Sequence, residues 1–334
     1  MYIIESYTLA VFFCVVTMLC WGSWGNTQKL AAKTWRYELF YWDYVIGVFL
    51  LSVIFGFTLG SHGEEGRSFM TDLVQVNRSN VVSALIGGVI FNAANILLSA
   101  SISIAGMSVA FPLGVGTALV LGVIVNYVST PKGDPIILFT GVALIVVAVI
   151  FNGIASGQMN KGETKSSSKG IWIALVAGVL MSFFFRFVAA AMDLDNFVSP
   201  AAGMATPYTA FFIFAVGMVL SNFLFNTILM KKPFVGSPVS YKDYFSGGIS
   251  THLVGVSGGL IWGLGSVLSY MAAEKAGAAI SYALGQGATM VAALWGVFIW
   301  KEFIGGGKAV NLLLFAMFLL FISGLVLIII SGGN

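Results

Sequence analysis

The sequence predicts an all-α polytopic membrane protein with ten transmembrane helices, arranged as two inverted five-helix repeats. Three observations predict this fold class: the composition, the long apolar runs and an internal duplication. Of the 334 residues, 58% are hydrophobic and 9% are charged, against about 25% charged residues in soluble domains. No soluble fold buries that much apolar surface, so we expect a multi-pass protein of a cytoplasmic (inner) or plasma membrane. The net charge of +3 gives no indication of a nucleic acid partner.

The duplication relates residues 87–116 to residues 258–287, which align without a gap at a constant offset of 171. Five glycines coincide in the two copies, and Asn95 falls on Ser266. Each copy reads as an apolar helix, a short turn containing glycine, and a second apolar helix. In a membrane, glycine lets neighbouring backbones approach closely, and such packing explains most of these glycines. The duplication itself indicates two homologous halves, which is typical of secondary transporters with a site at the repeat interface.

Ten apolar runs are long enough to cross a bilayer, which takes about 20 residues in a helix. The predicted spans are residues 5–28, 39–60, 80–103, 107–128, 135–156, 170–191, 204–229, 249–272, 278–300 and 308–331. Very short connections after the third and eighth spans predict antiparallel hairpins. A polar stretch, 158–169, predicts a linker between an N-terminal repeat (1–157) and a C-terminal repeat (170–334). Because five spans per repeat is an odd number, homologous helices are expected to run in opposite directions.

The positive charges predict the orientation of the chain. The odd-numbered connections hold eleven Lys and Arg residues, whereas the even-numbered connections hold four. Since cytoplasmic loops carry the excess of Lys and Arg, the odd-numbered connections are expected in the cytoplasm. Ten spans then leave both termini outside.

The first span contains Trp21 and Trp24, which share a helix face with Gln28. Tryptophans near the end of a span often form an interfacial aromatic belt. A binding site is the alternative interpretation, and the glycines interleaved with these tryptophans favour it, because a belt residue needs no close backbone approach. The two interpretations stay open.

The third span carries Asn92, Asn95, Ser99 and Ser103 along one face. Unpaired amides in hydrocarbon cost several kcal/mol, so this polar stripe must face protein or water. Hydrogen bonding between helices is one interpretation, and a cavity lined for a ligand is the other. The pattern predicts that Asn92 and Asn95 contact a ligand.

Matching polar and aromatic positions occur in the second half. Trp262 and Ser266 share a face of the eighth span, and Tyr282 and Gln286 share a face of the ninth. An apolar wall with several aromatic rings and a few amides suits an uncharged polar ligand that stacks and forms hydrogen bonds. We therefore expect these four side chains in the binding site.

Few ionisable residues fall within or near the spans. Arg186 is placed in the middle of the sixth span, where a charge is by default a functional hypothesis; a structural ion pair is the alternative. Asp43 and Glu5 lie near span ends and are interpreted as proton sites or as surface acids. His252 is a further titrating group, although a lone histidine is more often structural.

Signals of catalysis or of a bound metal are missing from the sequence. No cluster of His, Cys and Asp has the spacing of metal ligands, and no nucleophile with a base partner is suggested. Cys14 and Cys20 are six residues apart in one span, on different helix faces, so no disulfide is expected. We predict neither an enzyme nor a cofactor.

The layout resembles the drug/metabolite transporter superfamily, with ten helices in two halves. Residues 282–302 are similar to its repeat signature, and Pro112 matches a frequent proline. More narrowly, residues 1–6, 21–24 and 41–44 resemble segments of ureide permeases, as does the phenylalanine run before Arg186. Residues 1–6 resemble the opening of those permeases, residues 21–24 resemble their Leu-Gly-Thr-Trp-Pro segment, and residues 41–44 resemble their Tyr-Leu-Asp-Tyr segment.

Glucose/ribose-type uptake proteins share the same layout. Two features depart from the resemblance. Plant ureide permeases carry a long central loop with a phosphate-loop-like motif, which is missing here, so the chain is more similar to a bacterial relative. Many superfamily members also place both termini in the cytoplasm, opposite to the charge count.

The residues and the resemblance together predict a secondary active transporter. It is expected to import a small neutral polar metabolite by alternating access, driven by protons. Ureides such as allantoin, or nucleobases, come first, and sugars are the alternative. Export of hydrophobic cations requires an acid in an aromatic cavity, for which only Asp43 and Glu5 qualify. The expected partners are the substrate, protons and the bilayer, with a homodimer as a further option.

Overall fold

The computed structural model describes residues 1–159 and 168–333, and it confirms the all-α fold with ten helices able to cross a membrane in that part of the chain. Most of the predicted linker falls in 160–167, outside the described residues. The spans are α1 (Tyr7–Ala31), α2 (Tyr37–Phe57), α4 (Arg78–Ala105), α5 (Met107–Ser129), α6 (Pro135–Met159), α7 (Ser168–Ala189), α8 (Pro207–Lys231), α10 (Ile249–Ala276), a ninth span in three pieces, and α13 (Gly307–Gly332). The three pieces are α11 (Ala278–Gln286), α12 (Ala288–Leu294) and a π-helical turn, η1 (Trp295–Ile299).

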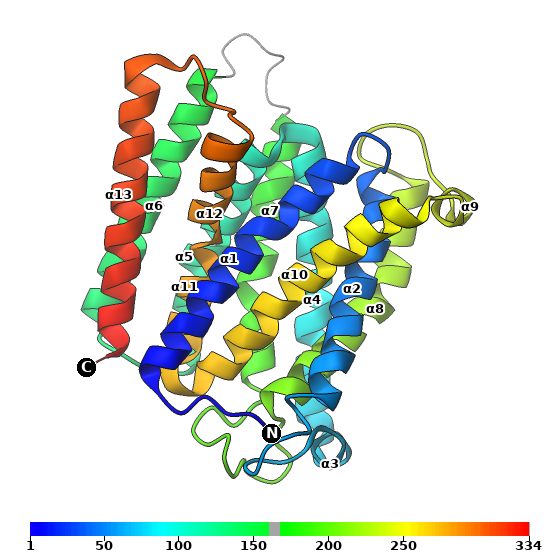
Figure 1. Cartoon of the computed structure of the whole chain (residues 1–334), viewed down its shortest axis with the longest axis vertical. Helices are drawn as coiled ribbons and strands as arrows, with labels where there is room; N and C mark the ends of the chain where they lie inside the picture. Colours follow the sequence, from blue (N-terminus) through cyan, green and yellow to red (C-terminus); the bar gives the residue numbers. More distant parts are fainter. Residues whose placement is uncertain (160–167, 334) are drawn as a thin grey trace.

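The spans form one bundle along the long axis of the molecule (Figure 1). Both chain ends lie at the same end of this bundle, which also holds the short helix α3 (Phe69–Gln75). A second short helix, α9 (Tyr241–Phe245), lies near the opposite end. An even number of crossings requires this placement of the termini, whereas which end faces the cytoplasm stays a prediction.

The two predicted hairpins turn at equivalent glycines. Gly106 ends α4 with φ 81° and ψ 158°, and Gly277 ends α10 with φ 83° and ψ 152°. Each backbone N–H bonds back into its helix, to the carbonyl of Ile102 at 3.0 Å and of Ala273 at 2.9 Å. Positive φ of this kind costs glycine little and other residues much more. The duplicated sequence therefore produces the same turn twice.

The two halves also pack reciprocally. A Cβ added to Gly88 in α4 would lie 2.0 Å from the carbonyl oxygen of Phe214. A Cβ added to Gly259 in α10 would lie 2.0 Å from the carbonyl oxygen of Tyr44. Gly88 and Gly259 are one pair of the sequence duplication, and they bring α4 onto α8 and α10 onto α2. Close helix packing thus explains both glycines. The inverted arrangement of the halves stays a prediction that this reciprocity supports.

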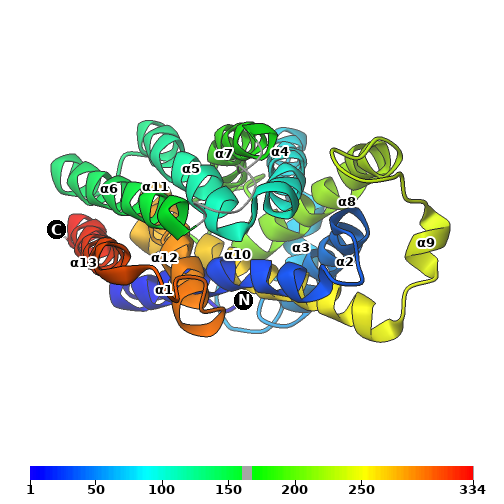
Figure 2. The same cartoon turned by 90° about the horizontal axis from the view of Figure 1, so that it is seen from above.

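Helices α6 and α13 lie side by side at one edge of the bundle (Figure 2). They meet through Gly141 and Gly324, where an added Cβ would lie 2.7 Å and 2.6 Å from the other glycine's carbonyl oxygen. The remaining spans surround a core of buried aromatic side chains. This core contains the candidate site.

Candidate functional site

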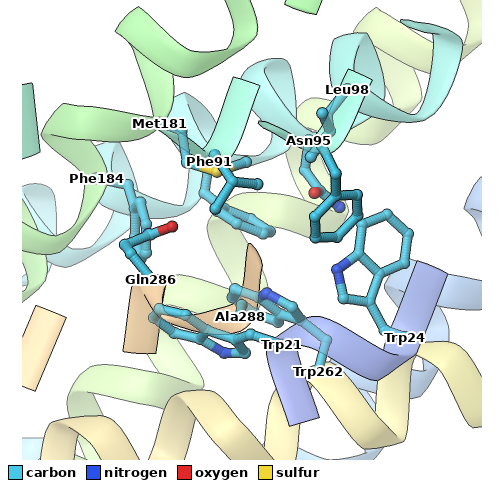
Figure 3. A pocket seen from close by; sticks show the side chains of 12 residues that line it. Trp21, Trp24, Phe91, Asn95, Leu98, Met181, Phe184, Trp262, Gln286 and Ala288 are labelled. Atoms are coloured by element: carbon cyan, nitrogen blue, oxygen red, sulfur yellow. The ribbon is translucent and has the colours of Figure 1, made fainter. Parts of the chain in front are cut away.

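A cavity lies among side chains, many of them aromatic, of α1, α4, α5, α7, α10 and the ninth span (Figure 3). Five of the eight predicted binding residues line it: Trp21, Trp24, Asn95, Trp262 and Gln286. The binding-site interpretation of the two tryptophans of α1 is therefore favoured over an interfacial belt, because both are buried in the bundle.

Stacked rings form one wall of the cavity. The indoles of Trp21 and Trp262 stack with their centroids 5.9 Å apart and their planes inclined by 8°. The Phe91 ring stacks on the Trp262 indole, with the two ring centroids 4.1 Å apart. Trp21 Nε1 donates a hydrogen bond of 3.1 Å to Ser266 Oγ, which fixes the orientation of the indole. A flat ligand can continue such a stack.

Two amide side chains provide the hydrogen-bonding groups of the cavity. Asn95 and Gln286 are 1% and 2% exposed, and their amide groups point into the space between the rings (Figure 3). Asn95 Nδ2 has no hydrogen-bond partner among the described residues. A buried donor without a partner costs about 1–3 kcal/mol. The hydroxyl groups of Tyr41 and Tyr44 lie near the Asn95 side chain, and the amide N–H group is available to an acceptor on a ligand.

The other three predicted binding residues lie behind the cavity wall. Asn92 Nδ2 donates to Ser221 Oγ at 2.9 Å, so the alternative of hydrogen bonding between helices applies to this residue. Ser266 positions Trp21, and Tyr282 donates to the carbonyl oxygen of Ala118 at 3.1 Å. These three side chains do not line the cavity, and their direct contact with a ligand stays a prediction. Their polar faces meet neighbouring helices that a single-helix pattern does not reveal.

The site is closed in this conformation. Its cavity measures about 20 Å³, which holds about one water molecule. A space of about 440 Å³ opens at the C-terminal end of α1, beside Lys29, Trp35 and Glu302. A space of about 320 Å³ opens at the end that holds the termini, beside Lys132 and Glu274. We call these the α1-end vestibule and the terminal-end vestibule. A metabolite-sized ligand requires the aromatic walls between them to move.

Asp43 is a buried acid, with 1% of its side chain exposed. Its Oδ1 accepts a hydrogen bond of 2.6 Å from the Tyr244 hydroxyl and lies 2.8 Å from His252 Nδ1. Its Oδ2 accepts a hydrogen bond of 3.0 Å from Trp35 Nε1. The interpretation of Asp43 as a surface acid is therefore wrong. His252, which the sequence left as a lone histidine, is its nearest titratable neighbour together with Tyr244.

The other two predicted charges are not buried. Arg186 is exposed and lies in the last turn of α7, three residues before the helix ends at Ala189, so its prediction as a mid-span charge is wrong. Glu5 is exposed and precedes α1, which begins at Tyr7. Neither side chain is in contact with Asp43.

The ureide permease family matches this chain over residues 40–169 and 156–331, which together are most of its length. The chain belongs to the ureide permease family. It is therefore a multi-pass membrane transport protein and not an enzyme, as the sequence predicted. The resemblance noted in the short motifs is confirmed over nearly the whole chain.

Relatives within this family are distant but collinear. The chain is 25% identical over 390 residues to ureide permease 1 of Arabidopsis thaliana, with all of both chains covered. It is 26% identical over 400 residues to ureide permease 5 of the same plant, covering 96% of that protein. A probable ureide permease A3 of Vigna unguiculata is 21% identical over 342 residues. A solved crystal structure, 14% identical, shares the fold with a TM-score of 0.58 over 95% of this chain and 97% of the other.

In this member of the ureide permease family, sequence reasoning missed the apolar part of the site. Phe91, Phe111 and Phe184 line the cavity together with aliphatic side chains. A phenylalanine in a membrane span carries no signal of its own, because lipid and protein neighbours both suit it. The duplication did single out two of these positions, since Phe91 and Phe111 coincide with Trp262 and Tyr282.

Proposed function

We propose that this ureide permease family member is a secondary active transporter that imports a small, neutral, polar metabolite: a ureide such as allantoin, or a nucleobase. The observation that carries this proposal is the unpaired amide of Asn95, aimed between stacked aromatic rings. The names of the relatives, which are ureide permeases, agree with it.

The chemistry of the wall matches such ligands. Ureides and nucleobases have flat or nearly flat rings with alternating carbonyl and N–H groups. Their faces suit the indoles, a carbonyl accepts from Asn95 Nδ2, and the second amide, Gln286, supplies another donor or acceptor. None of the described residues that line the cavity is charged. A charged ligand would lose its hydration there without a counter-ion, which is expensive.

The alternative substrates fit less well. A sugar carries a hydroxyl group on almost every carbon, and two amides cannot satisfy that number of donors and acceptors. A hydrophobic cation gains from aromatic faces, but the cavity wall lacks the carboxylate that an exporter of such cations would use. Asp43, the one buried acid of the two candidates, lies outside that wall.

Alternating access is supported by the closed site between the two vestibules. Either vestibule can connect to the cavity if the aromatic wall on its side opens, while the other wall keeps the opposite path shut. The reciprocal packing of the halves suits such a mechanism. Because a neutral substrate brings no charge, accumulation must draw on an ion gradient, and we assign this role to protons, with Asp43 as the acid that carries them.

Binding by purified protein tests the proposed site. Asn95→Leu is expected to weaken binding of radiolabelled allantoin or uracil about tenfold or more, the equivalent of about 1.4 kcal/mol. Asn222→Leu is the matched control, because Asn222 is also buried with an unpaired amide but does not line the cavity. Equal loss in both variants, or none in Asn95→Leu, would remove Asn95 from the site.

A further inference from the structure

Asp43, His252, Tyr244 and Trp35 form a compact group that we call the Asp43 cluster. Besides the three hydrogen bonds to the carboxylate, the Trp35 indole lies edge-on to the His252 ring, with centroids 5.1 Å apart. The cluster joins the start of α2 to α9 and to the start of α10 (Figure 1). None of its four residues lines the cavity.

The duplication provides an internal control for this cluster. The offset of 171 places Val81 on His252 and Ala84 on Gly255, whose added Cβ would lie 2.4 Å from Asp43 Cβ. Gly88 contacts Phe214 as Gly259 contacts Tyr44, so Phe214 and Tyr44 are equivalent positions. The residues that precede them, Ile213 and Asp43, are then equivalent as well.

At this equivalent position the other half has only apolar side chains. Ala84 and Ile213 are buried together, and Val81 packs against them. At this point α4 and α8 are packed by hydrophobic side chains, and the hydrogen bond between Asn92 and Ser221 lies further along the two helices. Packing does not require an acid and a histidine at the crossing of α2 and α10, and so their presence there needs a different explanation.

The cluster connects a buried group to the surface. Asp43 is 1% exposed at its side chain, whereas His252 is 24% exposed. His252 Nε2 lies next to Gly247, where an added Cβ would approach it to 2.8 Å, so the glycine keeps this side of the ring uncovered. Trp35 lines the α1-end vestibule. A proton on Asp43 therefore has a path to water through the histidine.

Tyr244 on α9 is the other titratable group that faces Asp43. Burial and its hydrogen bond to Asp43 raise the pKa of Tyr244, so this hydroxyl stays a neutral donor at physiological pH. No Lys or Arg side chain contacts the carboxylate in the described part of the chain. Asp43 and His252 are thus the two groups of the cluster able to exchange a proton.

We propose that Asp43 and His252 together carry the coupling proton, an inference that rests on the proposed function. The O–H bond of protonated Asp43 breaks as an N–H bond forms at Nδ1 of neutral His252. This leaves a carboxylate beside an imidazolium. The imidazolium then releases its Nε2 proton to water, and the neutral histidine keeps the Nδ1 proton that bonds to the carboxylate. One proton has moved from the interior to water, and His252 is the exchanging group.

Transport in liposomes tests this pair, with radiolabelled allantoin as the probe and the membrane potential clamped at zero. Two modes are compared: exchange of allantoin without a pH gradient, and accumulation driven by one pH unit. For one proton per neutral substrate, this gradient sustains about tenfold accumulation. The Asp43→Asn and His252→Gln variants are expected to exchange allantoin but not to accumulate it, so that its internal concentration rises no higher than the external one.

Two variants serve as controls. Tyr244→Phe removes a hydrogen bond from the cluster without removing an exchanging group, and His62→Gln changes the other histidine of the chain, which is exposed. Both should accumulate as the unchanged protein does. Full accumulation of allantoin by His252→Gln overturns the proposal. An equal loss of accumulation in Tyr244→Phe also overturns it, because the cluster would then serve to hold α9 in place. Absence of exchange by the unchanged protein contradicts the proposed function, and the role of the pair with it.

Discussion

The indoles of Trp21 and Trp262 stack on each other, and each comes from a different half of the chain. Trp21 lies on α1 in the N-terminal half, and Trp262 lies on α10 in the C-terminal half. Their planes are nearly parallel, and the hydrogen bond from Trp21 to Ser266 holds this arrangement. The stacked rings line a cavity that has room for about one water molecule, so a flat ligand can bind only when rings of the wall move. A ligand must therefore replace one ring contact with its own face.

Removal of the Trp262 indole should weaken binding more than removal of its N–H group. We expect Trp262→Leu to raise the Kd for allantoin or uracil about tenfold, because an aromatic pair contributes about 0.5–1.5 kcal/mol beyond the area it buries. Trp262→Phe keeps a ring and should change the Kd less. Equilibrium binding of a radiolabelled probe measures both, and equal Kd values for Trp262→Leu and the unchanged protein would exclude stacking on this ring.

The paired glycines should respond alike to substitution. Gly88→Ala and Gly259→Ala each place a methyl group 2.0 Å from a backbone carbonyl oxygen, which cannot move without shifting a helix. Both variants are expected to lower the melting temperature in detergent. Gly153→Ala is the control, since an added Cβ there meets no atom within 4 Å, and alanine favours a helix by about 1 kcal/mol. Melting curves for Gly88→Ala and Gly153→Ala that coincide would contradict the close packing.

Asp72 is expected to be essential for stability at the end that holds the termini. This fully buried acid accepts hydrogen bonds from Arg67 Nε at 2.8 Å, Gln75 Nε2 at 3.0 Å and the Thr206 backbone N–H at 2.7 Å. Removing one partner of a buried ion pair costs about 3–5 kcal/mol, so Asp72→Ala should unfold at a clearly lower temperature. Asp195→Ala, at an exposed position nearby, should not. A small effect of Asp72→Ala would mean that water replaces these bonds.

The spans and hairpins were predictable from the sequence because both depend on local signals. Apolar length determines a span, and the glycines at 106 and 277 supply a backbone conformation that other residues avoid. The ninth span was predicted as one helix, and its π-helical turn was not foreseen. The burial of Asp43 depends on α9 and α10, more than 190 residues away along the chain, which no local pattern contains.

The site was predictable where polar or aromatic residues stood out among apolar neighbours, as for Asn95 and Gln286. It was not predictable where the decisive fact is which helix a face meets. Asn92 and Asn95 are three residues apart on one helix, yet the first meets α8 and the second the cavity. Arg186 was misplaced because a charge near a helix end reaches the surface, and the apolar run gave no clear end.

Exchange of radiolabelled substrate by purified protein in liposomes tests the central claim most directly. Vesicles are loaded with unlabelled allantoin, uracil, glucose or ribose, and uptake of the matching labelled compound is followed without an ion gradient. We predict saturable exchange of allantoin or uracil that the other ureide or nucleobase inhibits, and no exchange of glucose or ribose. Exchange confined to the sugars, or absent for all four compounds in folded protein, would contradict transport of a neutral ureide or nucleobase.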